Sequence, residues 1–96
     1  MRLGIPLKGD IISPSKEADK FVRVNLVDGK MVSIDEFENR DSLVGMVDFF
    51  ITPKEEYVFD FLNMGAEPLL TPVEEMNIEE IVSAFLFREL YSYASI

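Results

Sequence analysis

The stretch FVRVNLVDGKMVSIDEF, residues 21–37, decides the fold of this chain. Residues 21–27 and 30–37 each alternate apolar with polar side chains, which is the pattern of a β-strand with one buried face. Asp28-Gly29 lies between the two runs, and an Asp-Gly pair suits a type I′ turn because both central positions need a positive φ. The stretch therefore predicts an antiparallel hairpin with strands at about residues 21–27 and 30–36.

A short strand is predicted before the hairpin, at Arg2–Leu7, because its alternate leucine and isoleucine side chains share one face. Lys8-Gly9-Asp10 turns the chain out of this strand, and Ile11–Lys20 has the composition of a polar loop. Glu38–Gly45, after the hairpin, is also polar and predicts a connecting loop.

The second half of the chain predicts two strand–helix units. Met46–Ile51 is nearly continuous apolar sequence, which is typical of a central strand covered on both faces. Thr52-Pro53-Lys54-Glu55 has the features of a helix start: a threonine cap, proline at the first helical position and glutamate to complete a capping box. The apolar side chains that follow predict a helix of about three turns that ends at Gly65.

The second unit begins with Ala66–Leu70, a strand that we expect at a sheet edge because Pro68 cannot donate to a β-ladder. Asn77 and Glu80 form a capping box at the start of a second, longer helix. Tyr91–Ile96 is an aromatic tail that extends the domain or frays. The order β-β-β-β-α-β-α predicts an α/β domain with a mixed sheet and packed helices. The apolar stripe of the second helix comprises Ile78, Ile81, Val82, Phe85, Leu86 and Leu90.

Composition limits the chemistry that the chain can do. Its 96 residues fit a single domain, 1–96, and a hydrophobic content of 48% supports a folded core despite a net charge of −9. Nine basic residues, scattered singly among eighteen acidic ones, exclude a cationic surface for nucleic acid or anionic membranes. The chain has no Cys and no His, so its own side chains offer neither thiolate nor imidazole.

We expect a cytoplasmic protein that is not a membrane protein. The segment Met1–Leu7 is too short and too broken by Gly and Pro for a signal peptide. No apolar run approaches the roughly 20 residues that span a bilayer.

Several segments, which together cover most of the chain, form a recognisable set. They are the opening Met1-Arg2-Leu3-Gly4-Ile5-Pro6, Ser13 before a polar loop, Phe21 at the start of the hairpin, the buried strand Val47–Ile51, the helix end Leu62-Asn63-Met64-Gly65-Ala66, the helix start Asn77-Ile78-Glu79-Glu80-Ile81 and the helix end Phe87-Arg88-Glu89-Leu90. These segments resemble the dinitrogenase iron–molybdenum cofactor biosynthesis family, of the NifX and NifB C-terminal type. The resemblance implies a ribonuclease-H-like mixed sheet of five strands in the order 3-2-1-4-5, with only strand 2 antiparallel, and two main helices. The helix that normally joins strands 3 and 4 is reduced or missing here, with Glu38–Gly45 in its place.

The same resemblance shows where the chain departs from the family. Members typically have a His-Phe-Gly-Arg-like stretch where this chain has Ser15-Lys16-Glu17-Ala18-Asp19, and a Gly-rich turn where it has Thr52-Pro53. Family members are linked to iron–sulfur or iron–molybdenum clusters, whose iron takes thiolate ligands, with imidazole as the usual substitute. Because this chain has neither, we expect no bound metal and no cofactor.

A catalytic site is not expected either. Two-metal phosphoryl chemistry needs several convergent carboxylates, and Asp48 and Asp60 have no evident acidic partner. The acidic group near the second helix is interpreted as a solvated first turn that the helix dipole favours. It comprises Glu74, Glu75, Glu79 and Glu80.

A small-molecule site, where one exists, is expected at the switch point of the implied sheet, outside the carboxyl ends of its first and fourth strands. That position places Lys8, Gly9 and Asp10 opposite Thr52, Pro53 and Lys54, with Ser13 and Lys16 overhanging. A helix N-terminus there could hold an anion. The alternative is that Thr52 and Glu55 already satisfy the free N–H groups of that helix.

Two functions remain open from the sequence. The first is a non-catalytic accessory or carrier-like protein of the resembled family, with a degenerate ligand site. The second is a protein-interaction domain that uses the surface exposed by the missing helix, as a homodimer or with another protein. On that side we expect Phe21, Met31 or the tail residues Tyr91 and Tyr93 to be exposed or folded over the sheet.

Overall fold

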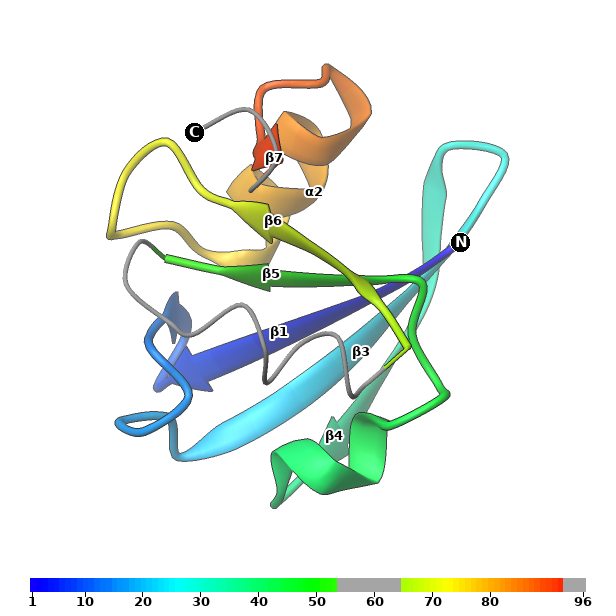
Figure 1. Cartoon of the computed structure of the whole chain (residues 1–96). Coiled ribbons are helices and arrows are strands. Elements are labelled where there is room, and N and C mark those ends of the chain that lie inside the picture. The colour runs from blue at the N-terminus through cyan, green and yellow to red at the C-terminus, as the bar shows by residue number, and fades with distance from the viewer. Residues whose placement is uncertain (54–64, 93–96) are drawn as a thin grey trace.

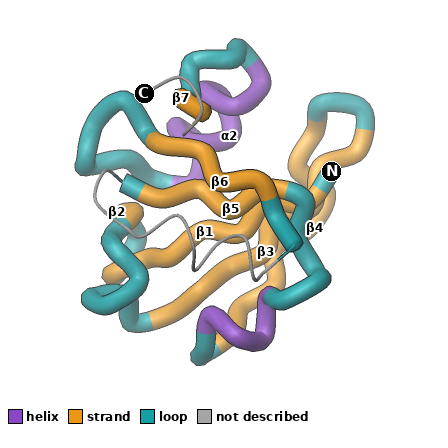
Figure 2. The backbone as a smooth tube through the Cα atoms, in the orientation of Figure 1, coloured by secondary structure: helices purple, strands orange, loops and turns teal. Residues whose placement is uncertain are grey.

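The computed structural model describes residues 1–53 and 65–92, and in these residues a mixed β-sheet forms the centre of the molecule (Figure 1). The sheet order is β4-β3-β1-β5-β6-β7, and β2 pairs with the end of β1 (Figure 2). The α/β class predicted from the sequence is confirmed. The elements are β1 (Arg2–Lys8), β2 (Ile11–Ile12), β3 (Lys20–Val27), β4 (Lys30–Phe37), the 3₁₀ helix η1 (Arg40–Leu43), β5 (Phe49–Thr52), β6 (Glu67–Leu70), α2 (Ile78–Leu86) and β7 (Tyr91–Ser92).

The strand directions divide the sheet into two halves around β1. On one side, β1 pairs antiparallel with β3, and β3 pairs antiparallel with β4. On the other side, β1 pairs parallel with β5, and β5 pairs parallel with β6. The carboxyl ends of β1 and β5 therefore lie side by side at one end of the sheet.

The predicted hairpin is confirmed as β3 and β4. Asp28 and Gly29 have φ values of 52° and 76°, as a type I′ turn requires. The register shifts between Asn25 and Leu26, which leaves Val32 of β4 without a cross-strand partner.

The main core lies between one face of the sheet and α2. Leu3, Ile5 and Leu7 of β1 form its centre, together with alternate residues of the neighbouring strands. The predicted capping box at the start of α2 is confirmed: Glu80 N–H donates to Asn77 Oδ1 at 2.9 Å, and Asn77 N–H donates to Glu80 Oε1 at 3.1 Å. This cap fixes the helix so that Ile81, with no exposed surface, faces the sheet.

The opposite face of the sheet has a smaller core, built around Gly4. Leu43 of η1 has no exposed surface and packs with Phe21, Val47 and Phe50. A Cβ atom on Gly4 would lie 3.3 Å from Leu43 Cδ1 and 3.2 Å from Phe50 Cδ2, so a larger residue would need these side chains to shift by a few tenths of an ångström. A four-residue 3₁₀ helix therefore covers sheet surface in the connection where the resembled family has a full helix.

Coverage of the sheet is uneven, as the sequence suggested, but the exposed residues differ in part. Phe21 is buried, whereas Met31 and Tyr91 are exposed. Val32 and Ile34 of β4 are exposed as well, because neither η1 nor α2 extends over the end of the hairpin. Tyr93 lies outside the described residues.

The strand predicted at Met46–Ile51 is shorter and begins later, at Phe49. Met46 N–H donates to the carbonyl of Leu43, which closes a turn after η1. The carboxylate of Asp48 then accepts from the N–H of Arg2 at 2.8 Å, while the N–H of Asp48 donates to Arg2 O at 2.9 Å, so Asp48 joins the chain to β1 just before β5 begins.

Two other strand assignments differ from the prediction. Residues Ile11–Ile12 of the predicted loop form a strand, because Ile12 is buried and pairs with Leu7. β6 is not the last strand, since β7 pairs with its residues Leu69 and Leu70. The N–H groups of Glu67 and Thr71 face β5, so by alternation the nitrogen of Pro68 faces away from β5. In the described chain β7 pairs with Leu69 and Leu70 but not with Pro68, so the missing N–H of the proline costs no ladder bond there.

The second helix ends at Leu86, not Leu90, and Leu86 is 43% exposed. The remaining predicted stripe residues Ile78, Phe85 and Leu90 are partly buried against the main core. The predicted helix after Pro53, with its cap partner Glu55, lies outside the described residues. Gly65, predicted to end that helix, has a φ of 72°. Within the described chain, no helix is long and apolar enough to cross a membrane.

Candidate functional site

The first candidate site is a cavity at the switch point, where the carboxyl ends of β1 and β5 adjoin. Its volume is about 410 Å³, and it contains Lys8, Ser13 and Pro53 from the predicted site. The other lining residues are Ile11, Ile12, Pro14, Glu17, Glu74 and Glu75. We call it the switch-point cavity.

Two connections hold the walls of this cavity in place. The turn from β1 into β2 is fixed by Asp19, whose carboxylate accepts from Gly9 N–H at 2.9 Å while its own N–H donates to Leu7 O at 2.9 Å. Ile12 N–H donates to Met76 O at 2.8 Å. This bond joins β2 to the segment before α2, and it brings Glu74 and Glu75 to the cavity.

The hydroxyl groups at the site are engaged locally. Ser13 is buried, and its Oγ donates to Pro14 O at 3.1 Å. Thr52 has no exposed surface, and its Oγ1 donates to Pro53 O at 3.2 Å. A serine or threonine nucleophile needs a hydrogen bond from its hydroxyl to a general base. In these contacts both hydroxyls donate to backbone carbonyls instead.

The charges of the switch-point cavity are mixed. Lys8 is its cation, and Glu17, Glu74 and Glu75 are its carboxylates. This set suits a small polar ligand with a positive or zwitterionic group rather than an anion. Among the described residues, no three His, Cys, Asp or Glu side chains are grouped so that they could hold a metal ion.

Not all the predicted site residues meet at this cavity. Gly9 forms the turn with a φ of 63°, and Asp10 lies on the far side of that turn. Lys16 lines a separate hollow beside Asn39 and Asp41. Lys54 lies outside the described residues.

Sequence reasoning missed the acidic wall of the cavity. Glu74 and Glu75 were interpreted as the first turn of a helix, but α2 begins after Asn77, so they precede it. Their position depends on the long-range bond from Ile12 to Met76, which no local pattern reveals. Glu17 lies in the loop for which the sequence predicts Lys16 as the site residue, and the structure places Glu17 at the cavity instead.

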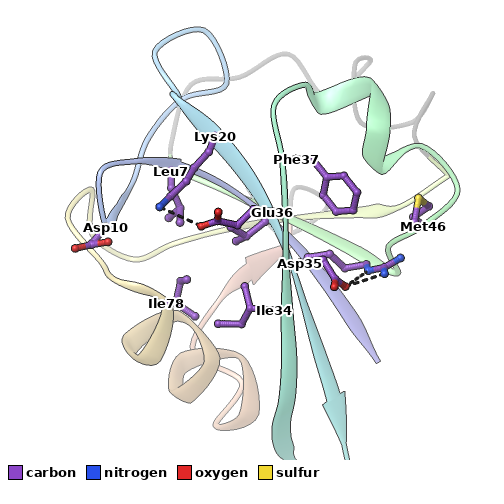
Figure 3. A pocket seen from close by; sticks show the side chains of 11 residues that line it. Leu7, Asp10, Lys20, Ile34, Asp35, Glu36, Phe37, Met46 and Ile78 are labelled. Carbon is purple, nitrogen blue, oxygen red and sulfur yellow. Dashed lines mark hydrogen bonds and ion pairs between the residues drawn. The ribbon is translucent and has the colours of Figure 1, made fainter.

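The second candidate site is the outer edge of β4, which pairs with no other strand in the described part of the chain. A hollow of about 850 Å³ surrounds this edge. Figure 3 shows its two sides: Ile34 lies on the side of Ile78 from α2, whereas Phe37 and Met46 lie on the other side. We call this surface the β4 edge.

Ion pairs hold the charged side chains of the β4 edge. Lys20 Nζ lies 3.4 Å from Glu36 Oε1 (Figure 3). Asp35 Oδ2 accepts from Arg23 Nε at 3.0 Å and Nη2 at 2.7 Å, and also from Asn25 Nδ2 at 3.0 Å. These hydrogen bonds, first that from Arg23, hold the pKa of Asp35 below its usual value because they stabilise the ionised carboxylate.

Comparison with known proteins identifies the fold. No family model matches the sequence, and no curated protein matches it. The crystal structure of a Methanocaldococcus jannaschii protein provisionally described as a dinitrogenase is similar, with a TM-score of 0.82 and 21% identity over 98% of this chain and 95% of that one. The NMR structure of a Thermotoga protein provisionally described as a NifB protein has a TM-score of 0.69 and 20% identity, over 95% of this chain and 91% of the other. The chain therefore has the fold of these proteins, and the resemblance drawn from its sequence is confirmed at the level of the fold.

Proposed function

We propose that this protein is a divergent, non-catalytic accessory member of the iron–molybdenum cofactor biosynthesis family that does not ligate cluster iron with its own side chains. The fold supports family membership, since structures described as a dinitrogenase and a NifB protein align with nearly the whole chain. The observed neighbours β4-β3-β1-β5-β6 also support a ribonuclease-H-like architecture.

The single observation behind the functional part is chemical. The full sequence contains no Cys and no His, which are the ligands that iron–sulfur iron takes in proteins. Carboxylates such as Glu17, Glu74 and Glu75 at the switch-point cavity are hard ligands that suit Mg²⁺ or Ca²⁺ and fit cluster iron poorly. A carrier role would then depend on contacts with a partner protein or on a ligand other than a bare cluster.

Anaerobic reconstitution tests this proposal. The chain is incubated with ferrous iron and sulfide, washed with a chelator and assayed for iron and for iron–sulfur absorption. We expect neither to remain. The variant with Glu74→Gln and Glu75→Gln shows whether any iron that survives the wash is held by carboxylates. Stoichiometric iron with a cluster absorption band in the isolated wild-type monomer would contradict the proposal.

The β4 edge favours a second candidate function, a protein-interaction domain. Val32 is 59% and Ile34 is 42% exposed on a strand with an open outer side. We infer that an extended segment of a partner protein adds to this edge, with alternate side chains entering the hollows beside Ile34 and Phe37. A second copy of the chain fits less well, because it would bring another net charge of −9 and a second bulge to the same edge.

The backbone of β4 gives a specific test of this second function. Leu26 N–H donates to Met1 O, so the N–H groups of alternate β3 residues face β1, including that of Val22. Val22 lies opposite Glu36, and the N–H of Glu36 therefore faces outward, available to an added strand. A peptide of alternating valine and lysine is expected to bind this edge and shift the NMR amide signals of residues 33–37. Glu36→Pro removes the outward N–H and is expected to abolish these shifts.

The control for that experiment is a peptide of alternating valine and glutamate, which the acidic chain should repel. If neither peptide binds and the chain is a strict monomer by sedimentation at micromolar concentration, the interaction function loses its support. Self-association that Glu36→Pro abolishes would identify a second copy as the occupant.

A further inference from the structure

A third cavity lies at the opposite end of the sheet from the switch-point cavity, where β5 begins and α2 ends. Its volume is about 440 Å³, within the range of small-molecule sites. Six of its lining residues are apolar, namely Met1, Phe49, Leu69, Phe85, Leu86 and Leu90, and the seventh is Arg88. We call it the Arg88 cavity.

The apolar walls of the Arg88 cavity are ordered by packing against the main core. Phe49 of β5 and Phe85 of α2 meet edge to face, with ring centroids 5.2 Å apart and an interplanar angle of 63°. Both rings, with Leu90, are partly buried against the core cluster. Leu86 remains 43% exposed, so the cavity presents apolar surface to solvent.

The backbone at Arg88 is unusual for an arginine. Glu89 N–H donates to Ala84 O at 2.8 Å and Arg88 N–H donates to Phe85 O at 3.2 Å, which is the Schellman arrangement of a helix end. Arg88 occupies the position of this motif that normally takes glycine, and its φ is 58°. Glycine would be more stable at this position, so the chain carries arginine here at a conformational cost.

The guanidinium of Arg88 has no ion-pair partner among the described residues. Arg2, Lys20 and Arg23 each pair with a carboxylate, whereas Arg88, like Lys8 and Lys30, pairs with none in the described part of the chain. Among the residues that the structure describes, no carboxylate side chain lines the Arg88 cavity. A guanidinium beside apolar walls is the arrangement that recognises a carboxylate with a hydrophobic body.

We propose that the Arg88 cavity binds a small hydrophobic carboxylic acid, with the acyl or aromatic body against Phe49, Phe85 and Leu69 and the carboxylate at the Arg88 guanidinium. This ligand class differs from any ligand of the switch-point cavity, where carboxylates outnumber the single lysine. The two sites lie at opposite ends of the sheet, so one can be tested without altering the other.

The test uses the whole chain with octanoate and phenylacetate, followed by calorimetry and by the NMR amide signals of Phe49, Leu69 and Phe85. We expect one-to-one saturable binding of at least one acid, and binding of octanol at least about tenfold weaker, because a hydrogen bond to a charged group is lost. Inorganic phosphate, which is an anion without an apolar body, should not compete.

Arg88→Gly gives a sharp variant, because it should raise the melting temperature while weakening acid binding by about tenfold to a hundredfold. Arg88→Gln removes the charge without relieving the backbone and should weaken binding to a similar extent. Phe87→Ala is the matched control, since Phe87 is 74% exposed and does not line the cavity. The proposal is overturned if neither acid binds, if octanol binds as tightly as octanoate, or if both Arg88 variants bind like the wild type.

Discussion

Leu43→Ala is the substitution that most directly tests how this chain manages with a 3₁₀ helix between β4 and β5. Leu43 has no exposed surface and packs against Gly4, Val47 and Phe50 on the second face of the sheet. Replacing a fully buried leucine with alanine costs about 2–5 kcal/mol, depending on how far the surroundings collapse into the space. η1 has only four residues and lies on top of the sheet, so it can settle, and we expect the lower end, about 2–3 kcal/mol.

That loss is measurable by urea unfolding followed by circular dichroism. With a slope of about 1–1.5 kcal/mol per molar urea for a small domain, the midpoint should fall by about 2 M. The control is Val44→Ala, because Val44 is the next residue, is 49% exposed and should change the unfolding free energy by less than about 0.5 kcal/mol. Equal midpoints for the two variants would refute the conclusion that η1 is a packed part of the fold.

Three further predictions concern the cap, the second core and the acid behaviour of the chain. Asn77→Ala should lower the unfolding free energy by about 1 kcal/mol, because it removes the acceptor for Glu80 N–H; urea unfolding measures this, and an unchanged midpoint would argue against the capping box. Gly4→Val should cost about 1–3 kcal/mol by overpacking against Phe50, and a neutral result in the same assay would show that the second face is loosely packed. The pKa of Asp35 is lowered in the folded state, so its contribution to stability is present above about pH 4 and is lost as the pH falls through the folded pKa. Asp35→Asn should therefore lower the urea midpoint more at about pH 6 than at about pH 2.5. An equal effect at both pH values would exclude the ion pair with Arg23 as the source of the stabilisation.

The parts of the fold that the sequence predicts are those set by local chemistry. The Asp28-Gly29 turn and the Asn77 cap depend on residues within a few positions of each other, and both are present as expected. Strand β1 was also predicted within one residue of its end, since alternating apolar side chains define it.

The parts that differ depend on contacts between distant residues. β5 begins at Phe49, directly after Asp48, whose N–H and carboxylate both bond to the backbone of Arg2, forty-six residues away. The strand at Ile11–Ile12 forms by pairing with β1, and the acidic wall at Glu74 depends on the bond from Ile12 to Met76. Periodicity cannot report such partners, so the walls of the switch-point cavity were only half predicted.

The Arg88 cavity was missed for a related reason. The predicted second helix continued to Leu90, which would have placed Arg88 on a regular helix surface. Its left-handed backbone arises only because the helix stops at Leu86 and the chain turns to form β7. A positive φ at arginine has no sequence signal comparable to that of glycine.

The central claim, that this chain has the fold of the cofactor-biosynthesis proteins but does not hold cluster iron itself, is tested most directly by isolating it without oxygen from the cells that make it. Native mass spectrometry then gives the mass of the monomer and of any complex in the same extract. We predict a monomer at the mass of the bare chain, with any cluster confined to complexes that include another protein. A monomer that retains iron and sulfide in whole-number ratios after chelator treatment would contradict the account.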